Sequence, residues 1–195
     1  MSFSAPDMNE LVAARQGDAL ARQRLAERVL HTVVQWCARL GGPRVDADDA
    51  AHDVMIVLIT RLPLFDAPER FPSWLYGVTR RVLAQHRRRA WFRRWVPGVE
   101  IADRPDPAAS PGRLAESNQT SRRVQLALED LSDSHREILV LADVEERTET
   151  EIAELLQLPL GTVRSRTRRA REVFLGVAPR HGLRPSHLEV VEGGS

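Results

Sequence analysis

Residues 148–172 read TETEIAELLQLPLGTVRSRTRRARE, and this stretch decides the fold of the C-terminal half. Thr148 and Glu151 have the spacing of a capping box, in which each side chain bonds the other residue's backbone N–H at the start of a helix. The apolar residues that follow predict a short helix, a turn at 157–158 and a second helix with Pro159 in its first turn. Two short helices joined so tightly predict a helix-turn-helix, whose second helix lies in the major groove of DNA.

The second helix of this motif is rich in arginine and has two distinct sides. Its spacing predicts an inward, packing side made of Val163, Thr167, Ala170 and Phe174. Its outward side carries Arg164, Ser165, Arg168 and Arg169. Guanidinium groups donate in a fixed fork that fits guanine edges and phosphates, so these four residues are the candidates for DNA contact. Arg166 and Arg171 are assigned to phosphates or solvent, and the bland alternative is that the whole helix is a solvated surface.

Helices separated by clear breakers are predicted throughout residues 7–95. An apolar repeat between Leu25 and Leu40 stops at a Gly-Gly-Pro sequence, and the next helix opens with aspartates at 46, 48 and 49 that suit a helix N-terminus. The centre of that helix, VMIVLI, would also fit a buried strand, but its acidic start favours a helix. A third long helix is predicted to begin with Pro72 in its first turn.

The chain changes character after this first domain. Residues 96–119 are rich in proline and small polar residues and have no apolar period, which predicts a flexible linker. Helical periodicity returns from Thr120 to about Leu175, and residues 176–195 read as a C-terminal tail. The predicted fold is therefore all-α, with two small helical domains, 7–95 and 120–175, joined by a linker.

Composition excludes several classes of function. All basic residues are arginines, the formal net charge is +1, and the single Cys37 allows neither an internal disulfide nor a multi-cysteine metal site. The six histidines are scattered, so no metal and no cofactor is assigned. No apolar run is long enough to span a bilayer and the first residues do not resemble a signal peptide, which predicts a cytoplasmic protein without membrane insertion. No Gly-rich phosphate loop or nucleophile–base pair indicates an enzyme.

Three segments together resemble one family. EIAELL followed by P-x-G-T-V-R-S-R-x-x-R-A-R is typical of the fourth conserved region of bacterial sigma-70 factors of the extracytoplasmic-function (ECF) branch. The chain departs from it at Thr167, where the family usually has a larger apolar residue. DDAAHDVMIVLIT (48–60) resembles the polymerase-binding helix of the second conserved region, and FPSWLYGVTRRVLAQHRRR (71–89) resembles its promoter-melting helix. The resemblance covers about residues 7–175.

The resemblance implies a division of labour between the domains. The first domain would dock on core RNA polymerase and open the minus-10 element, and the second would read the minus-35 element through the outward residues of its helix-turn-helix. The implied core-binding residues are Asp49, His52 and Asp53, although the family normally has Gln and Glu at the last two positions. The implied minus-10 residues are Phe65, Asp66, Arg80, Arg81, Gln85 and Arg88. Partners implied are core RNA polymerase, promoter DNA and an anti-sigma factor.

Another class of protein uses a similar motif. A transcription factor of the response-regulator type would carry the same helix-turn-helix, but it needs a phospho-acceptor domain of alternating strands and helices. The all-helical prediction for residues 7–95 argues against that alternative. The tail at 176–195 lies beyond the usual end of the family and is a second candidate, beside an anti-sigma factor, for regulation.

Overall fold

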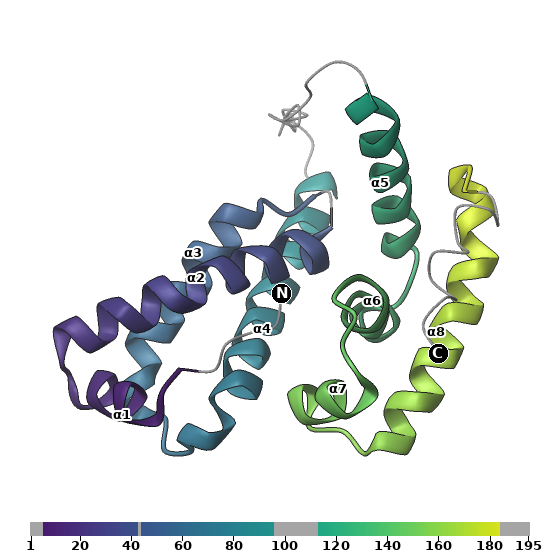
Figure 1. The fold of residues 1–195 in the computed structure, drawn as a ribbon. Helices are drawn as coiled ribbons and strands as arrows, with labels where there is room; N and C mark the ends of the chain where they lie inside the picture. The colour runs from purple at the N-terminus through teal and green to yellow at the C-terminus, as the bar shows by residue number, and fades with distance from the viewer. Residues whose placement is uncertain (1–5, 43, 96–112, 184–195) are drawn as a thin grey trace.

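The chain is helical throughout the parts that the computed structural model describes, residues 6–42, 44–95 and 113–183. No strand occurs in these ranges, so the all-α prediction is confirmed. The helices form two lobes that lie side by side (Figure 1). None of the helices described combines the length and the apolar character needed to span a bilayer.

Four helices make up the first lobe: α1 (Met8–Gln16), α2 (Ala19–Gly41), α3 (Ala47–Arg61) and α4 (Phe71–Trp95). Aspartates cap two of them at the N-terminus. The Asp18 side chain accepts a hydrogen bond from the Ala21 N–H at 2.7 Å, and the Asp46 side chain accepts from the N–H groups of Asp48 and Asp49 in α3. These bonds satisfy donors that have no partner within the helix. The VMIVLI segment is therefore part of a capped helix, as predicted, and not a strand.

The core of the first lobe is built around Trp36 of α2 and Tyr76 of α4. Their rings meet edge to face, with centroids 4.9 Å apart and planes at 89°. Cys37 is buried beside Trp36, and burial raises the pKa of its thiol to about 12. The thiol is therefore a packed, protonated side chain.

The second lobe comprises α5 (Arg113–Glu129), α6 (Asp133–Leu139), a π-helix η3 (Val140–Val144), α7 (Glu149–Leu156), α8 (Leu160–Val177) and a 3-10 turn η4 (Ala178–His181). Two bounds differ from the prediction. Helix α5 begins at Arg113, inside the predicted linker, because RLAESN contains neither proline nor glycine to stop it. The lobe also continues past residue 175, since Ala178 and Leu183 are buried against Ala127. The rest of the predicted linker and tail lies outside the described residues.

Helices α4 and α2 both carry contacts from the first lobe to the second. Helix α4 lies beside α6 and α7 (Figure 1). The Ser73 hydroxyl at its start donates to the Glu154 carbonyl of α7 at 2.8 Å, and the Trp36 indole N–H donates to Glu145 Oε2 at 3.4 Å. The two lobes are thus in direct contact, and α4 carries residues at that contact.

Candidate nucleic-acid interface

The predicted helix-turn-helix is formed by α7 and α8. The Thr148 backbone N–H and hydroxyl both donate to Glu151 Oε2 at 2.8 Å, and the Glu151 N–H donates to Thr148 Oγ1 at 3.3 Å. The first of these bonds, and then the hydroxyl bond, hold the pKa of the Glu151 carboxyl below its usual value. The turn follows at Gln157, whose φ of 54° is left-handed. The capping box and turn are confirmed, but Pro159 immediately precedes the first turn of α8 instead of lying in it.

The inward side of α8 consists of the residues predicted for it. Val163, Thr167 and Ala170 are buried, and Phe174 packs against the same core while remaining partly exposed. Thr167 Oγ1 is buried without a hydrogen-bond partner among the described residues. A buried hydroxyl that makes no hydrogen bond lowers stability, so this departure from the family pattern has a structural cost.

The outward side of α8 is exposed at all four predicted positions: Arg164, Ser165, Arg168 and Arg169. The arginine side chains are 64%, 78% and 68% exposed and lie against acids of the same motif. Arg164 Nε is 2.7 Å from Glu149 Oε2, while Arg168 and Arg169 reach the two oxygens of Glu172 at 3.3 and 2.9 Å. Exposed pairs of this kind contribute about 0–1 kcal/mol each, so phosphate groups can replace the carboxylates.

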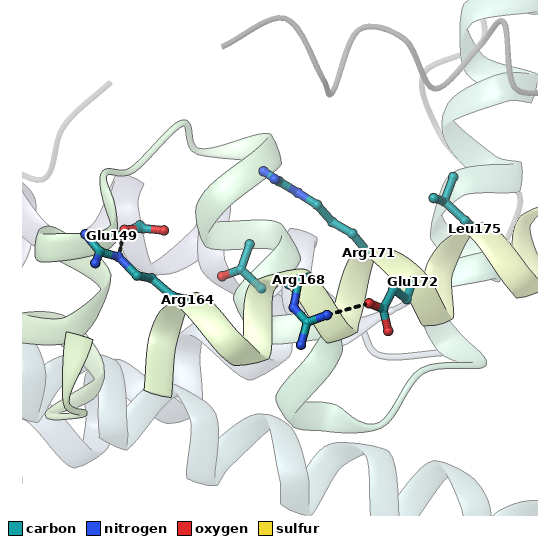
Figure 2. Close-up of a pocket in the computed structure, with 7 residues that line it drawn as sticks. Glu149, Arg164, Arg168, Arg171, Glu172 and Leu175 are labelled. Atoms are coloured by element: carbon teal, nitrogen blue, oxygen red, sulfur yellow. Dashed lines mark hydrogen bonds and ion pairs between the residues drawn. The ribbon is translucent and has the colours of Figure 1, made fainter. Parts of the chain in front are cut away.

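An open hollow of about 320 Å³ lies on this surface between the start of α7 and the outward side of α8. Figure 2 shows Arg164 directed to Glu149 at one end and Arg168 directed to Glu172 further along the helix. Arg171 leaves the helix in a different direction from Arg168. The hollow therefore presents two guanidinium groups of the predicted set on one surface.

Arg171 requires a correction, because the sequence assigned it to phosphates or solvent. Its Nη2 lies 2.6 Å from Asp143 Oδ1 and its Nε lies 3.3 Å from Asp143 Oδ2. The Asp143 side chain, in η3, is only 10% exposed. Arg171 thus ties α8 to the π-helix η3. No local spacing signals this contact, since the partners are 28 residues apart.

The predicted minus-10 residues Phe65 and Asp66 lie in the connection between α3 and α4, between the 3-10 turns η1 (Leu62–Leu64) and η2 (Pro68–Arg70). The Phe65 ring stacks on Trp74 of α4, with centroids 4.7 Å apart, and its carbonyl accepts a hydrogen bond from Arg15 Nη1 at 3.2 Å. Asp66 is exposed. Phe65 therefore fixes the connection in place, while Asp66 faces solvent.

The other minus-10 residues lie along α4, and the structure separates them into two groups. Arg81, Gln85 and Arg88 are exposed at intervals of four and three residues, which places them on one face of the helix. Arg80 instead forms an ion pair with Glu137 of the second lobe, with its Nε 2.6 Å from Glu137 Oε1. The predicted set is therefore not a single surface in this arrangement of the lobes.

The predicted core-binding residues lie in the first half of α3. Asp49 and His52 are exposed, and Asp53 is partly exposed. Asp53 Oδ2 lies 2.8 Å from His86 Nε2 of α4, a contact across 33 residues that sequence spacing does not reveal. Asp49 and His52 are thus presented to solvent, while Asp53 also ties α3 to α4.

Among the residues that the structure describes, no group of three or more histidine, cysteine, aspartate or glutamate side chains is placed to hold a metal ion. The interactions of the site that sequence reasoning missed all cross the lobes or join distant helices. They are the contacts of Glu137 with Arg80, of Asp143 with Arg171 and of His86 with Asp53.

Two family models match the chain. The model described as "Sigma-70 region 2" matches residues 25–93, and the one described as "Sigma-70, region 4" matches residues 121–173. The first match contains the polymerase-binding and melting segments proposed from the sequence. The second contains α7, the turn and α8 as far as Val173.

Curated relatives are similar over most of the chain. The ECF RNA polymerase sigma factor SigD of Mycobacterium tuberculosis is 31% identical over 176 residues, which cover 87% of this chain and 83% of the relative. The ECF RNA polymerase sigma factor SigW of Bacillus subtilis is 27% identical over 168 residues, covering 82% and 90%.

Two solved structures have a similar fold. One is CnrH in complex with the cytosolic domain of CnrY, with a TM-score of 0.62 and 23% identity, covering 89% of this chain and 97% of that one. The other is the sigma factor RpoE in complex with the anti-sigma factor NepR from Bartonella quintana, with a TM-score of 0.54 and 20% identity, covering 89% and 98%.

Proposed function

Because the chain belongs to the ECF branch of the sigma-70 family of RNA polymerase factors, we propose that it directs core RNA polymerase to specific promoters. In this proposal the first lobe binds the polymerase and opens the minus-10 element, and the second lobe recognises the minus-35 element. The chain then acts in the cytoplasm as a binding and strand-opening subunit, and the polymerase performs the chemistry.

The observation that carries the proposal is the exposed arginine surface of α8. Its three outward arginines project from a helix that is held in place by the buried Val163 and Ala170 and by the ion pair of Arg171 with Asp143. A rigid helix with guanidinium groups on its free side is what major-groove readout requires. The exposed ion pairs of these arginines with Glu149 and Glu172 are weak, so DNA phosphates and guanine edges would replace the carboxylates.

The face of α4 that bears Arg81, Gln85 and Arg88 is the proposed surface for the separated strand. Arg81 and Arg88 are seven positions apart, which is about 10 Å along the helix axis and enough for a row of contacts to a strand backbone. The exposed Asp66 and the neighbouring stacked aromatic pair Phe65 and Trp74 lie near the start of the same helix. This arrangement suits a strand that runs along α4 with a base held near the connection.

Polymerase binding is proposed for α3, through Asp49, His52 and Asp53. Asp49 and His52 are exposed and Asp53 is partly exposed, so their side chains are accessible to a basic partner surface. We also propose an anti-sigma factor as a regulatory partner. The solved structure of RpoE in complex with the anti-sigma factor NepR, a protein of this fold bound to such a partner, supports this proposal.

Run-off transcription tests the proposal directly. Purified bacterial core polymerase is incubated with a genomic promoter library, with and without this chain, and new transcripts are mapped. We expect transcripts that depend on the chain and share two upstream elements. The response-regulator alternative predicts DNA binding without core binding, so failure of the chain to co-purify with core polymerase and to yield new transcripts contradicts the proposal. Arg168→Ala serves as the matched variant, which should retain core binding and lose upstream recognition.

A further inference from the structure

Glu137 is an acidic residue of α6 that is buried against the other lobe. Its side chain is 8% exposed, and Arg80 Nε of α4 lies 2.6 Å from its Oε1. Burial raises the pKa of Glu137, and the Arg80 guanidinium opposes that rise. The pKa of the Tyr76 phenol is raised by burial and, after that, by the negative charge of Glu137. A residue of the second lobe thus has its charge compensated by the first.

A second ion pair joins the same two helices. Arg87 Nη2 of α4 lies 2.9 Å from Asp133 Oδ2 of α6, and Arg87 Nη1 donates to the Leu40 carbonyl at 3.0 Å. Asp133 and Glu137 are one turn apart on α6, while Arg80 and Arg87 are two turns apart on α4. The two acids of α6 therefore pair with the two arginines of α4 in opposite directions along the helices, Glu137 with Arg80 and Asp133 with Arg87.

A third acid extends the pattern away from α6. Glu145, which follows η3, accepts a hydrogen bond from the Trp36 indole and lies 3.4 Å from Arg39 Nη1. In all three contacts the acid belongs to the second lobe and the donor to the first. An open pocket of about 430 Å³ runs between the lobes at this level, and its charged lining consists of Arg80, Arg81 and Arg87 of α4 with Asp133, Arg136 and Glu137 of α6.

We propose that α6 docks on α4 as an internal anion, with Glu137 and Asp133 in the place of strand phosphates, so that the unbound chain rests in a closed state that masks part of its own melting surface. While it is paired with Glu137, the Nε of Arg80 is not free to donate to a phosphate. The masking of DNA contacts rests on the proposed function, whereas the closed state itself does not.

The chemistry of the contact makes the closed state reversible. The Asp133 side chain is 64% exposed and its pair with Arg87 is open to counterions, so salt weakens it. Nucleic acid carries a far higher density of negative charge than three carboxylates, so a strand along α4 displaces α6 by competition. Opening of the lobes and capture of the strand are then coupled.

The first test asks whether Glu137 keeps the lobes together, and it uses the full chain without DNA or polymerase. Small-angle X-ray scattering of wild type at 0.1 M and 1 M salt is compared with Glu137→Gln, which removes the charge and keeps the shape. Glu146→Gln is the matched control, because Glu146 is an exposed acid of the same lobe and the change in net charge is identical. We expect a larger radius of gyration for Glu137→Gln at low salt and for wild type at high salt, but not for Glu146→Gln.

The second test asks whether closure masks Arg80. Binding of a labelled 20-nucleotide single strand of mixed sequence is measured at low salt by fluorescence anisotropy. We expect Glu137→Gln to bind about fivefold more tightly than wild type or Glu146→Gln. In an Arg80→Ala background the same change should give no gain, because the arginine that it releases is absent.

The outcomes separate the two proposals. An unchanged radius for Glu137→Gln, with helical content retained by circular dichroism, overturns the closed state even if the chain directs transcription. A variant that opens yet binds the strand no better overturns the masking. A closed chain that shows the expected gains but yields no transcripts with core polymerase overturns only the promoter function. Asp133→Asn, at the exposed rim, repeats both tests should Glu137→Gln lose helical content.

Discussion

Arg171 and Asp143 form a two-point ion pair that ties α8 to the π-helix across 28 residues of chain. Because the Asp143 side chain is nearly buried, removing its partner leaves a carboxylate without its compensating charge. We predict that Arg171→Ala lowers the free energy of unfolding of the second lobe by about 1.5–3 kcal/mol. Urea denaturation followed by circular dichroism measures the loss. Arg122→Ala, at an exposed position of α5 in the same lobe, is the control and should change stability by less than about 0.5 kcal/mol; equal losses would contradict a special role for Arg171.

Thr167 offers a change in the opposite direction. Its hydroxyl is buried on the inward side of α8 without a hydrogen-bond partner among the described residues. Thr167→Val replaces that hydroxyl with a methyl group of similar volume, so we predict a gain of about 1 kcal/mol in the free energy of unfolding. Thermal unfolding should show a midpoint higher by a few degrees, since about 1 kcal/mol shifts a small domain by roughly 4–8 °C. The half-exposed Thr162 provides the control Thr162→Val, and a lower midpoint for Thr167→Val would sink the prediction.

The two DNA surfaces should respond differently to loss of one arginine. Arg168→Ala is predicted to weaken binding to duplex that contains the minus-35 element by about 1–3 kcal/mol, the usual contribution of an arginine at a base edge. Arg81→Ala should leave that affinity unchanged and reduce opening, measured by permanganate reactivity of promoter thymines in the presence of core polymerase. Arg24→Ala, an exposed arginine of α2, controls for the change in net charge. Equal small losses for all three variants would indicate only nonspecific attraction to phosphates.

Cys37 should be chemically silent in the folded chain. Burial raises the pKa of its thiol to about 12, and only the thiolate reacts with disulfide reagents. We therefore predict that Ellman's reagent at pH 8 labels almost no thiol in the native protein and one thiol per chain in guanidinium chloride. Cys37→Ala, which has no thiol, gives the background signal of the assay. Rapid labelling of the native protein would show that the core around Trp36 opens readily.

Sequence reasoning succeeded where the interacting groups are close along the chain. The Thr148 and Glu151 capping box, the Asp46 cap of α3 and the inward and outward sides of α8 all depend on spacings of two to four residues, which the helix geometry fixes. The boundary at Arg113 was missed because a proline-rich segment just before it suggested a longer linker than the helix-forming residues allow.

The rest could not be predicted because it depends on how the helices pack. Asp53 with His86, and Arg171 with Asp143, are separated by 33 and 28 residues. Nothing in their spacing identifies a partner on another helix. Arg80 illustrates the consequence, since residues 80 and 81 are neighbours and yet only Arg80 forms an ion pair with α6.

The π-helix η3 (Val140–Val144) has one residue more than a regular α-helical turn, and this extra residue sets the direction in which α8 faces. The Glu145 N–H donates to the Val140 carbonyl five residues back, at 2.9 Å, where an α-helix would bond four residues back. Deleting one residue here would restore a regular turn and rotate everything that follows by about 100° relative to α6. The arginines of α8 would then face a different side of the lobe with every side chain intact. Promoter reading by this chain should therefore tolerate substitution of the exposed Val144 in η3 but no single-residue deletion.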